Sequence, residues 1–83
     1  MNNQYSTQRF RLGGGKFCEI VKHRTVTGQP EFSVRFFHLE VDGYQHTTKK
    51  ASHLTRAEAE KESGLTYDRE REQFNEPATV KEG

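Results

Sequence analysis

The dipeptide Asp42-Gly43 is the strongest constraint on the fold, because it separates two runs of strand-like composition. One run extends from Phe32 to Val41 and the other from Tyr44 to Ala51. Asp-Gly favours a two-residue hairpin turn with positive φ at both positions, so the two runs are predicted to pair as antiparallel strands. A further strand is predicted one loop earlier, from Phe17 to His23.

Two apolar sets alternate out of phase within the run from Phe32 to Val41. A regular strand would place the two sets on opposite faces and expose one of them. We interpret the adjacent Phe36 and Phe37 as a β-bulge, which inserts one residue and turns both sets toward the core. The alternative, a central strand covered on both faces, needs more chain than the sequence provides. The sets are Phe32, Val34 and Phe36, and Phe37, Leu39 and Val41.

The predicted register places two cations side by side on the outward face of the sheet. Counting back from the turn and across the bulge, Arg35 is expected opposite Lys49. Like charges directly opposite one another destabilise a strand pair, so an anion could sit between them, either a phosphate or a partner's carboxylate. The other interpretation is that both side chains extend into water, where isolated surface charges have little effect.

A short helix is predicted after the sheet, from Arg56 to Ser63. Thr55 is expected as its N-cap, and Glu58 three residues later completes a capping box. Gly64 is expected as a left-handed C-cap. Two helical turns are too short to be stable alone, so this helix is expected to pack on the sheet. A second short helix is predicted from Tyr67 to Phe74, because these two aromatic residues would share one helical face.

These elements predict an α+β fold: a three-stranded antiparallel sheet packed by one short α-helix, with a second short helix and flexible termini. The chain has 83 residues, the size of one small domain. We expect a flexible N-terminal arm over 1–15, a sheet-plus-helix domain over 16–65 and an acidic C-terminal helix or tail over 66–83. Such a sheet has two open edges, through which a homodimer could form.

The charge distribution is uneven along the chain. Residues 1–56 contain nine Lys and Arg against four Asp and Glu, whereas residues 57–83 contain four against eight. A basic body can bind an anionic partner, and an acidic tail can cover that body or bind a basic partner. The candidate partner-binding or anion-binding residues are Lys22, Arg24, Arg35, Tyr44, Lys49, Lys50 and Arg56. The candidate acidic surface consists of Glu58, Glu62, Asp68 and Glu70.

No catalytic, metal or cofactor site is predicted. The four histidines lack the spacing of a metal site, and His38 and His46 are expected on opposite faces of the hairpin. The single cysteine, Cys18, has no partner for a disulfide and is expected to be buried and inert. No apolar run reaches the length of a membrane helix and the first residues do not resemble a signal peptide, so a cytoplasmic protein is expected.

The order of strand, strand, Asp-Gly hairpin, strand and then "LTRAEAE" resembles the three-strand-plus-helix DNA-binding modules of the AP2 and integrase arm-binding type. The resemblance covers residues 16–63. It implies that a basic sheet enters the DNA major groove. The matching positions are Arg35, Lys49 and Lys50 on the sheet, and Thr55, Glu58 and Ala59 at the helix entry.

The whole chain also resembles small accessory proteins of phages and mobile elements, such as anti-CRISPR inhibitors, in its size, polar termini and single sheet-helix unit. Such proteins act by occupying a surface of a larger machine. The function expected from the sequence is therefore a small non-enzymatic inhibitor or adaptor that binds a nucleic-acid-handling protein complex in the host cell cytoplasm. The alternative is a nucleic-acid-binding module that contacts DNA or RNA through the basic face of its sheet.

Overall fold

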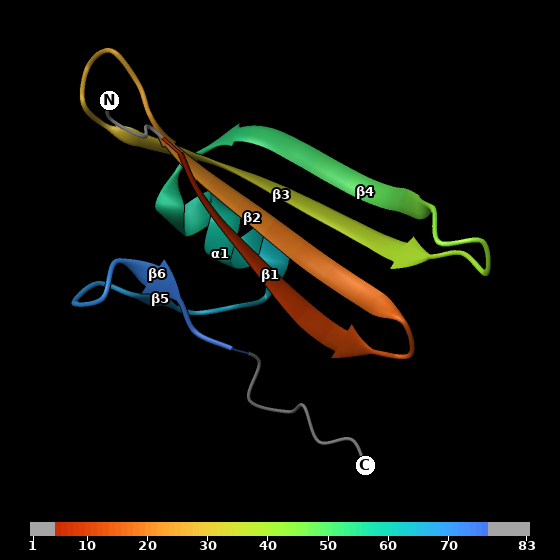
Figure 1. Ribbon diagram of the computed structural model, residues 1–83. Coiled ribbons are helices and arrows are strands. Elements are labelled where there is room, and N and C mark those ends of the chain that lie inside the picture. The colour runs from red at the N-terminus through yellow and green to blue at the C-terminus, as the bar shows by residue number, and fades with distance from the viewer. Residues whose placement is uncertain (1–4, 77–83) are drawn as a thin grey trace.

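The computed structural model describes residues 5–76 and has an α+β fold. Four antiparallel strands form one sheet in the order β1-β2-β3-β4, and a two-stranded hairpin follows a single helix (Figure 1). The elements are β1 (Tyr5–Gly13), β2 (Lys16–Arg24), β3 (Pro30–Leu39), β4 (Gln45–Leu54), α1 (Arg56–Ser63), β5 (Tyr67–Asp68) and β6 (Gln73–Phe74).

One face of the sheet is covered and the other is open. α1 lies behind the sheet in Figure 1, and the β5–β6 hairpin is seen beside it at the lower left. Both pack on the same face, because Ala59 of α1 and Phe74 of β6 belong to one core with Ile20 and Val34. The core forms between them, because residues at every second position of β2 and β3 turn toward the helix. Its buried members are Phe10, Cys18, Ile20, Phe32, Val34, Ala59, Leu65 and Phe74.

The sheet has a fourth strand, β1, where a flexible arm over 1–15 was predicted. Phe10 pairs with Cys18 and is only 4% exposed, so β1 contributes to the core. The glycines from Gly13 to Gly15 all have positive φ and form the tight turn into β2. Residues 1–4 lie outside the described residues. The polar composition of this segment hid the strand, because an edge strand with one buried aromatic residue carries little apolar periodicity.

The prediction that a bulge in β3 turns both apolar sets toward the core is wrong. β3 pairs with β2 without interruption, so Phe36 and Phe37 point to opposite faces. The irregularity opposite Phe36 and Phe37 lies in β4, where Thr48 is the extra residue. β4 bulges a second time near His53, which has a positive φ of 59°.

The hairpin between β3 and β4 forms where Asp42-Gly43 predicts it, but its loop is longer by one residue. The Gly43 amide donates to the carbonyl of Glu40, and the Glu40 amide donates to the carbonyl of Tyr44, both at 2.8 Å. Gly43 has a φ of 92°, whereas Asp42 stays outside the left-handed region and accepts from the Tyr44 amide instead. A turn closed by a left-handed glycine is the usual three-residue hairpin loop.

The longer loop and the place of the bulge together change the predicted register. The extra loop residue alone would bring Arg35 opposite Thr48, but the bulge adds its residue to β4 and not to β3, which moves the partner of Arg35 two residues the other way. Arg35 lies opposite Lys50 and not opposite Lys49. Lys49 lies opposite Phe36 and therefore on the covered side of the sheet.

The helix α1 has the predicted bounds and both predicted caps. The Glu58 amide donates to the Thr55 hydroxyl at 3.1 Å, and the Thr55 amide donates to the Glu58 carboxylate at 2.9 Å. Gly64 adopts the left-handed conformation, and Leu65 behind it is buried.

The second predicted helix, from Tyr67 to Phe74, is replaced by the β5–β6 hairpin. Asp68 accepts hydrogen bonds from the amides of Glu70 and Arg71 within the turn, and Glu72 then adopts a positive φ of 57°, which an α-helix cannot contain. Tyr67 and Phe74 still share a face, because they pair across the two strands. The Gln8 side chain joins this hairpin to β1 by donating to the Phe74 carbonyl at 3.0 Å and accepting from its amide at 2.8 Å.

Candidate functional site

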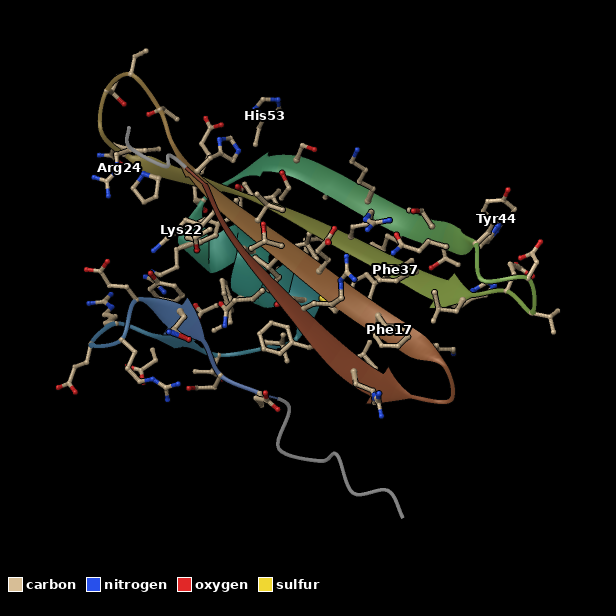
Figure 2. The ribbon with its side chains drawn as sticks, in the orientation of Figure 1. Phe17, Lys22, Arg24, Phe37, Tyr44 and His53 are labelled. Carbon is tan, nitrogen blue, oxygen red and sulfur yellow. The ribbon has the colours of Figure 1, made fainter. Side chains whose placement is uncertain are left out.

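The candidate site is the open face of the sheet, which no helix or hairpin of the described residues covers. Phe17 from β2 and Phe37 from β3 lie side by side on this face (Figure 2). Their rings stack nearly parallel, with centroids 5.3 Å apart and planes inclined by 14°. Since no helix or hairpin between residues 5 and 76 shields this aromatic pair from water, other side chains must do so.

Two arginines supply that cover. The guanidinium carbon of Arg35 lies 4.4 Å from the Phe37 ring centroid, and that of Arg9 lies 5.3 Å from it. Both distances are within the range of a cation–π contact. Phe37 is consequently only 2% exposed, although it lies outside the core. Long side chains here replace a second layer of secondary structure.

Glu19 holds the two arginines in place. One carboxylate oxygen lies 2.8 Å from the Arg9 Nη2 atom and the other lies 2.8 Å from the Arg35 Nη2 atom. The Arg35 Nε–H donates to the same carboxylate at 3.1 Å. Partial burial would by itself raise the pKa of Glu19, but the hydrogen bonds and positive charges of Arg9 and Arg35 outweigh it and hold that pKa below its usual range.

Arg35 has almost no donor left for an external ligand. Beyond its bonds to Glu19, its Nη1 donates to the Thr47 hydroxyl and its Nη2 to the Gln45 side-chain oxygen, both at 3.1 Å. Glu19 of the same chain therefore lies beside Arg35, where the sequence left open either a phosphate, a partner's carboxylate or water. We name the group Arg9, Phe17, Glu19, Arg35 and Phe37 the arginine–phenylalanine cluster.

Two other cations on the open face are free. Arg11 lies opposite Phe17 in the register and Lys50 lies opposite Arg35, and both are exposed. Neither has a hydrogen bond or an ion pair with another residue between 5 and 76. Lys50 borders a shallow hollow of about 360 Å³ on this face, whose floor includes Val21 and Ser33.

The structure divides the predicted basic residues among four places. Arg35 and Lys50 lie on the open face. Lys49 lies on the covered side, where its Nζ is 3.1 Å from a carboxylate oxygen of Glu62 in α1. Tyr44 is 72% exposed at the tip of the β3–β4 hairpin. The remaining three, Lys22, Arg24 and Arg56, line a separate hollow at the other end of the sheet.

Most of the predicted acidic surface is occupied within the chain. Glu58 caps α1, Glu62 pairs with Lys49 and Asp68 closes the turn of the β5–β6 hairpin. Glu70 is exposed in that turn. Among these four residues, only the Glu70 side chain has no hydrogen bond or ion pair within residues 5–76.

The histidines and the cysteine of the described residues do not come together in one site. His38 and His46 lie on the same face with ring centroids 5.0 Å apart, which corrects the prediction of opposite faces and follows from the one-residue change in register. Within residues 5–76 no group of three His, Cys, Asp or Glu side chains is arranged to hold a metal ion. Cys18 is buried, and burial together with the nearby Glu19 raises the pKa of its thiol to about 11.

Sequence reasoning missed Arg9, Phe17 and Glu19 as parts of a site. Arg9 could not be placed, because its strand was taken for a flexible arm. Phe17 and Glu19 alternate with Cys18 and Ile20, which was the signal for a second face of β2. The opposite charges of Arg9 and Glu19 become informative only once β1 is paired with β2.

Comparison with known proteins identifies no matching family, no similar curated protein and no similar solved structure. Among the described residues, none of the helices has the length and apolar character needed to cross a membrane.

Proposed function

We propose that this protein is a small non-enzymatic inhibitor or adaptor, which docks the open face of its sheet on an acidic surface of a protein complex that handles nucleic acid. The observation that carries the proposal is the arginine–phenylalanine cluster on an uncovered sheet face. Aromatic residues and arginines are enriched in the buried centres of protein interfaces. Hydrogen bonds to Glu19 already restrain Arg9 and Arg35, so these side chains lose less freedom when a partner covers them.

Charge favours an acidic partner. The open face presents Arg9, Arg11, Arg35 and Lys50 against the carboxylates of Glu19 and Glu31. Since Glu19 already serves both Arg9 and Arg35, the cations available to a partner are Arg11 and Lys50. They flank the aromatic pair on β1 and β4, so carboxylates on a partner could meet them at the rim of the contact.

The details of the cluster favour a protein over a nucleic acid. Phe37 is covered by arginine side chains and presents no free ring for a base to stack on. Arg35 has its donors committed to Glu19, Thr47 and Gln45. The class of partner, a complex that handles nucleic acid in a host cytoplasm, follows only from the resemblance of the chain to phage inhibitor proteins.

A nucleic-acid-binding module is the second candidate, and one observation favours it. The acidic residues of α1 and the β5–β6 hairpin lie on the covered side of the sheet, away from the open face (Figure 1). The acidic residues of α1 and of the β5–β6 hairpin therefore do not face a phosphate backbone placed against Arg11 and Lys50.

The proposal is tested with two double variants that change the charge equally. Arg11→Glu with Lys50→Glu reverses the free cations of the open face. Lys61→Glu with Arg71→Glu reverses two exposed cations on the covered side and serves as the control. Partners are first captured from a nuclease-treated lysate of the source organism, and the binding of each purified partner is then measured by calorimetry.

We expect the open-face variant to bind the purified partner at least about tenfold more weakly, because its carboxylates would meet those of the partner. The control variant is expected to keep wild-type affinity. Circular dichroism and melting temperatures confirm that both variants fold. Equal losses in the two variants, or unchanged affinity in the open-face variant, would contradict the proposal.

A further inference from the structure

A second basic site lies at the end of the sheet far from the β3–β4 hairpin. A hollow of about 400 Å³ forms there between the end of β2, the β2–β3 loop, the start of α1 and the β5–β6 hairpin. Figure 2 shows Lys22 and Arg24 at this end of the sheet, whereas Phe17 and Phe37 lie toward the other end. The hollow is therefore separate from the arginine–phenylalanine cluster.

Positive charge dominates the lining of this hollow. Four cations, Lys22 and Arg24 from β2, Arg56 from α1 and Arg69 from the β5–β6 turn, come from three segments of the chain, and Glu72 contributes one carboxylate. Cations brought together from distant positions repel one another, and a bound anion would relieve that repulsion. His23 also lines the hollow at its border with the open face.

Two of the four cations are fixed. The Lys22 ammonium donates to the Glu72 carbonyl at 3.1 Å and to the Tyr67 hydroxyl at 3.4 Å. Its distance of 3.9 Å from the Glu72 carboxylate shows only a loose ion pair. Arg56 donates through Nη1 to Glu60 at 2.9 Å, which leaves its other nitrogens without a bond to any described residue.

The other two cations are free. Arg24 and Arg69 are exposed at the rim, and neither has a hydrogen bond or an ion pair with another residue in the described part of the chain. A guanidinium presents paired N–H donors that match two oxygens of one phosphate group. Two exposed arginines without partners among the described residues and two fixed cations thus line the same hollow, where they can donate to one phosphate group.

We propose that this hollow binds the phosphate group of a phosphomonoester of nucleotide size. A phosphomonoester is close to a dianion at neutral pH, since its second pKa is about 6. The volume of the hollow falls in the range of about 300–1,000 Å³ that is usual for small-molecule sites, and it exceeds what one phosphate group requires. Gly28, Pro30 and the Tyr67 ring provide the less polar part of the lining. The proposal does not depend on what binds the open face.

The test is a titration of the full chain, uniformly labelled with ¹⁵N, followed by NMR at pH 7.5 and constant ionic strength. The probes are adenosine 5′-monophosphate, inorganic phosphate and adenosine. We expect both phosphates to shift the amide signals of Arg24, Gly28 and Arg69, and adenosine to leave them unchanged. Tighter binding of the nucleotide than of inorganic phosphate would show that the organic part is held, whereas equal affinity would assign the site to the phosphate group alone.

The variant for this test is Arg24→Gln with Arg69→Gln. Lys61→Gln with Arg71→Gln is the matched control, because it removes the same charge from exposed positions that do not line the hollow. Phosphate affinity should fall at least about tenfold in the first variant and stay within about twofold of the wild type in the control. Equal losses in both variants, or amide shifts in the wild type that are spread over its surface, would overturn the proposal.

Discussion

The two faces of the sheet exclude water from their aromatic side chains in different ways. On the covered face Ile20, Phe32 and Val34 are buried against α1 and the β5–β6 hairpin. On the open face Phe37 is buried almost as deeply, but its cover consists of Phe17 and of the long side chains of Arg9 and Arg35. Between residues 5 and 76, the one helix and the one small hairpin lie on a single side of the sheet.

The difference shows that a side chain in this molecule can have low solvent exposure for two physical reasons. The covered face excludes water with packed apolar groups, so its stability depends little on pH or salt. The exclusion of water from the open face depends on two charged side chains that Glu19 holds over Phe37, and such long side chains can move more easily than a packed core. A partner that docks there would replace water above a surface that is already ordered.

The largest effect is expected from Phe32→Ala on the covered face. Phe32 is 1% exposed and meets the rings of Tyr67 and Phe74 edge to face at 5.9 and 5.7 Å. Losing a buried ring that other elements surround costs about 3–5 kcal/mol. Urea denaturation of the wild type and the variant measures the difference. A loss below about 1 kcal/mol would mean that the hairpin is not packed on the sheet as described.

A smaller effect is expected from Phe37→Ala on the open face, and this pair of variants tests the comparison directly. The side chains above Phe37 can collapse into the space or admit water, so we expect a loss of about 2 kcal/mol. The same urea denaturation measures it. A loss equal to that of Phe32→Ala would show that the open face is as rigidly packed as the core.

Gly43→Val tests the turn that sets the register of β3 and β4, and with it which residues lie on each face of the sheet. Gly43 has a φ of 92° and no atom within 4 Å of the position that a Cβ would occupy, so the cost is conformational and not steric crowding by neighbours. A β-branched residue in this region costs about 1–2 kcal/mol. Gly43→Asn should cost less, because asparagine tolerates the left-handed region. Melting temperatures that are equal to the wild type in both variants would place the turn elsewhere.

Glu19→Gln is expected to have the smallest effect on stability at neutral pH, about 1 kcal/mol, and a distinctive pH dependence. Because folding lowers the pKa of Glu19, its ionised form stabilises the folded state fully above the unfolded pKa of about 4.3. This contribution is lost as the pH falls through the lower folded pKa.

The measurement is the urea midpoint of the wild type and of Glu19→Gln between pH 7 and pH 3. Glutamine resembles the protonated acid, so the difference between the two proteins should shrink as the pH falls. A difference that stays constant over this range would show that the charge of Glu19 does not hold the cluster together.

The sequence was sufficient for those parts of the fold that local chemistry determines. Thr55, Glu58 and Gly64 specify both ends of α1 through capping bonds that form within a few residues. Asp42-Gly43 locates the hairpin for the same reason. The predicted α+β class, with an antiparallel sheet and one short helix, is confirmed by the structure.

The features that depend on distant pairing could not be derived from the sequence. Whether the extra residue of a bulge lies in β3 or in β4 is decided by the regular pairing of β3 with β2, which no short window contains. The aromatic residues at the two ends of the segment from Tyr67 to Phe74 have the spacing of one helical face. The side chains of Asp68, Lys22 and Gln8 instead bind the backbone of this segment as a β-hairpin. The cluster was hidden for the same reason, since Arg9 reaches Glu19 only across a strand pair.

The most direct test of the account is whether the open face binds a nucleic acid by itself. Fluorescence anisotropy would follow DNA and RNA oligonucleotides, single-stranded and double-stranded and without a terminal phosphate, across a salt series. We predict no saturable binding up to about 100 µM protein at physiological salt, the weak end of non-specific affinities. Tight binding with a steep salt dependence, lost in Arg11→Glu with Lys50→Glu and kept in Lys61→Glu with Arg71→Glu, would contradict the protein-docking proposal and make the sheet a nucleic-acid surface.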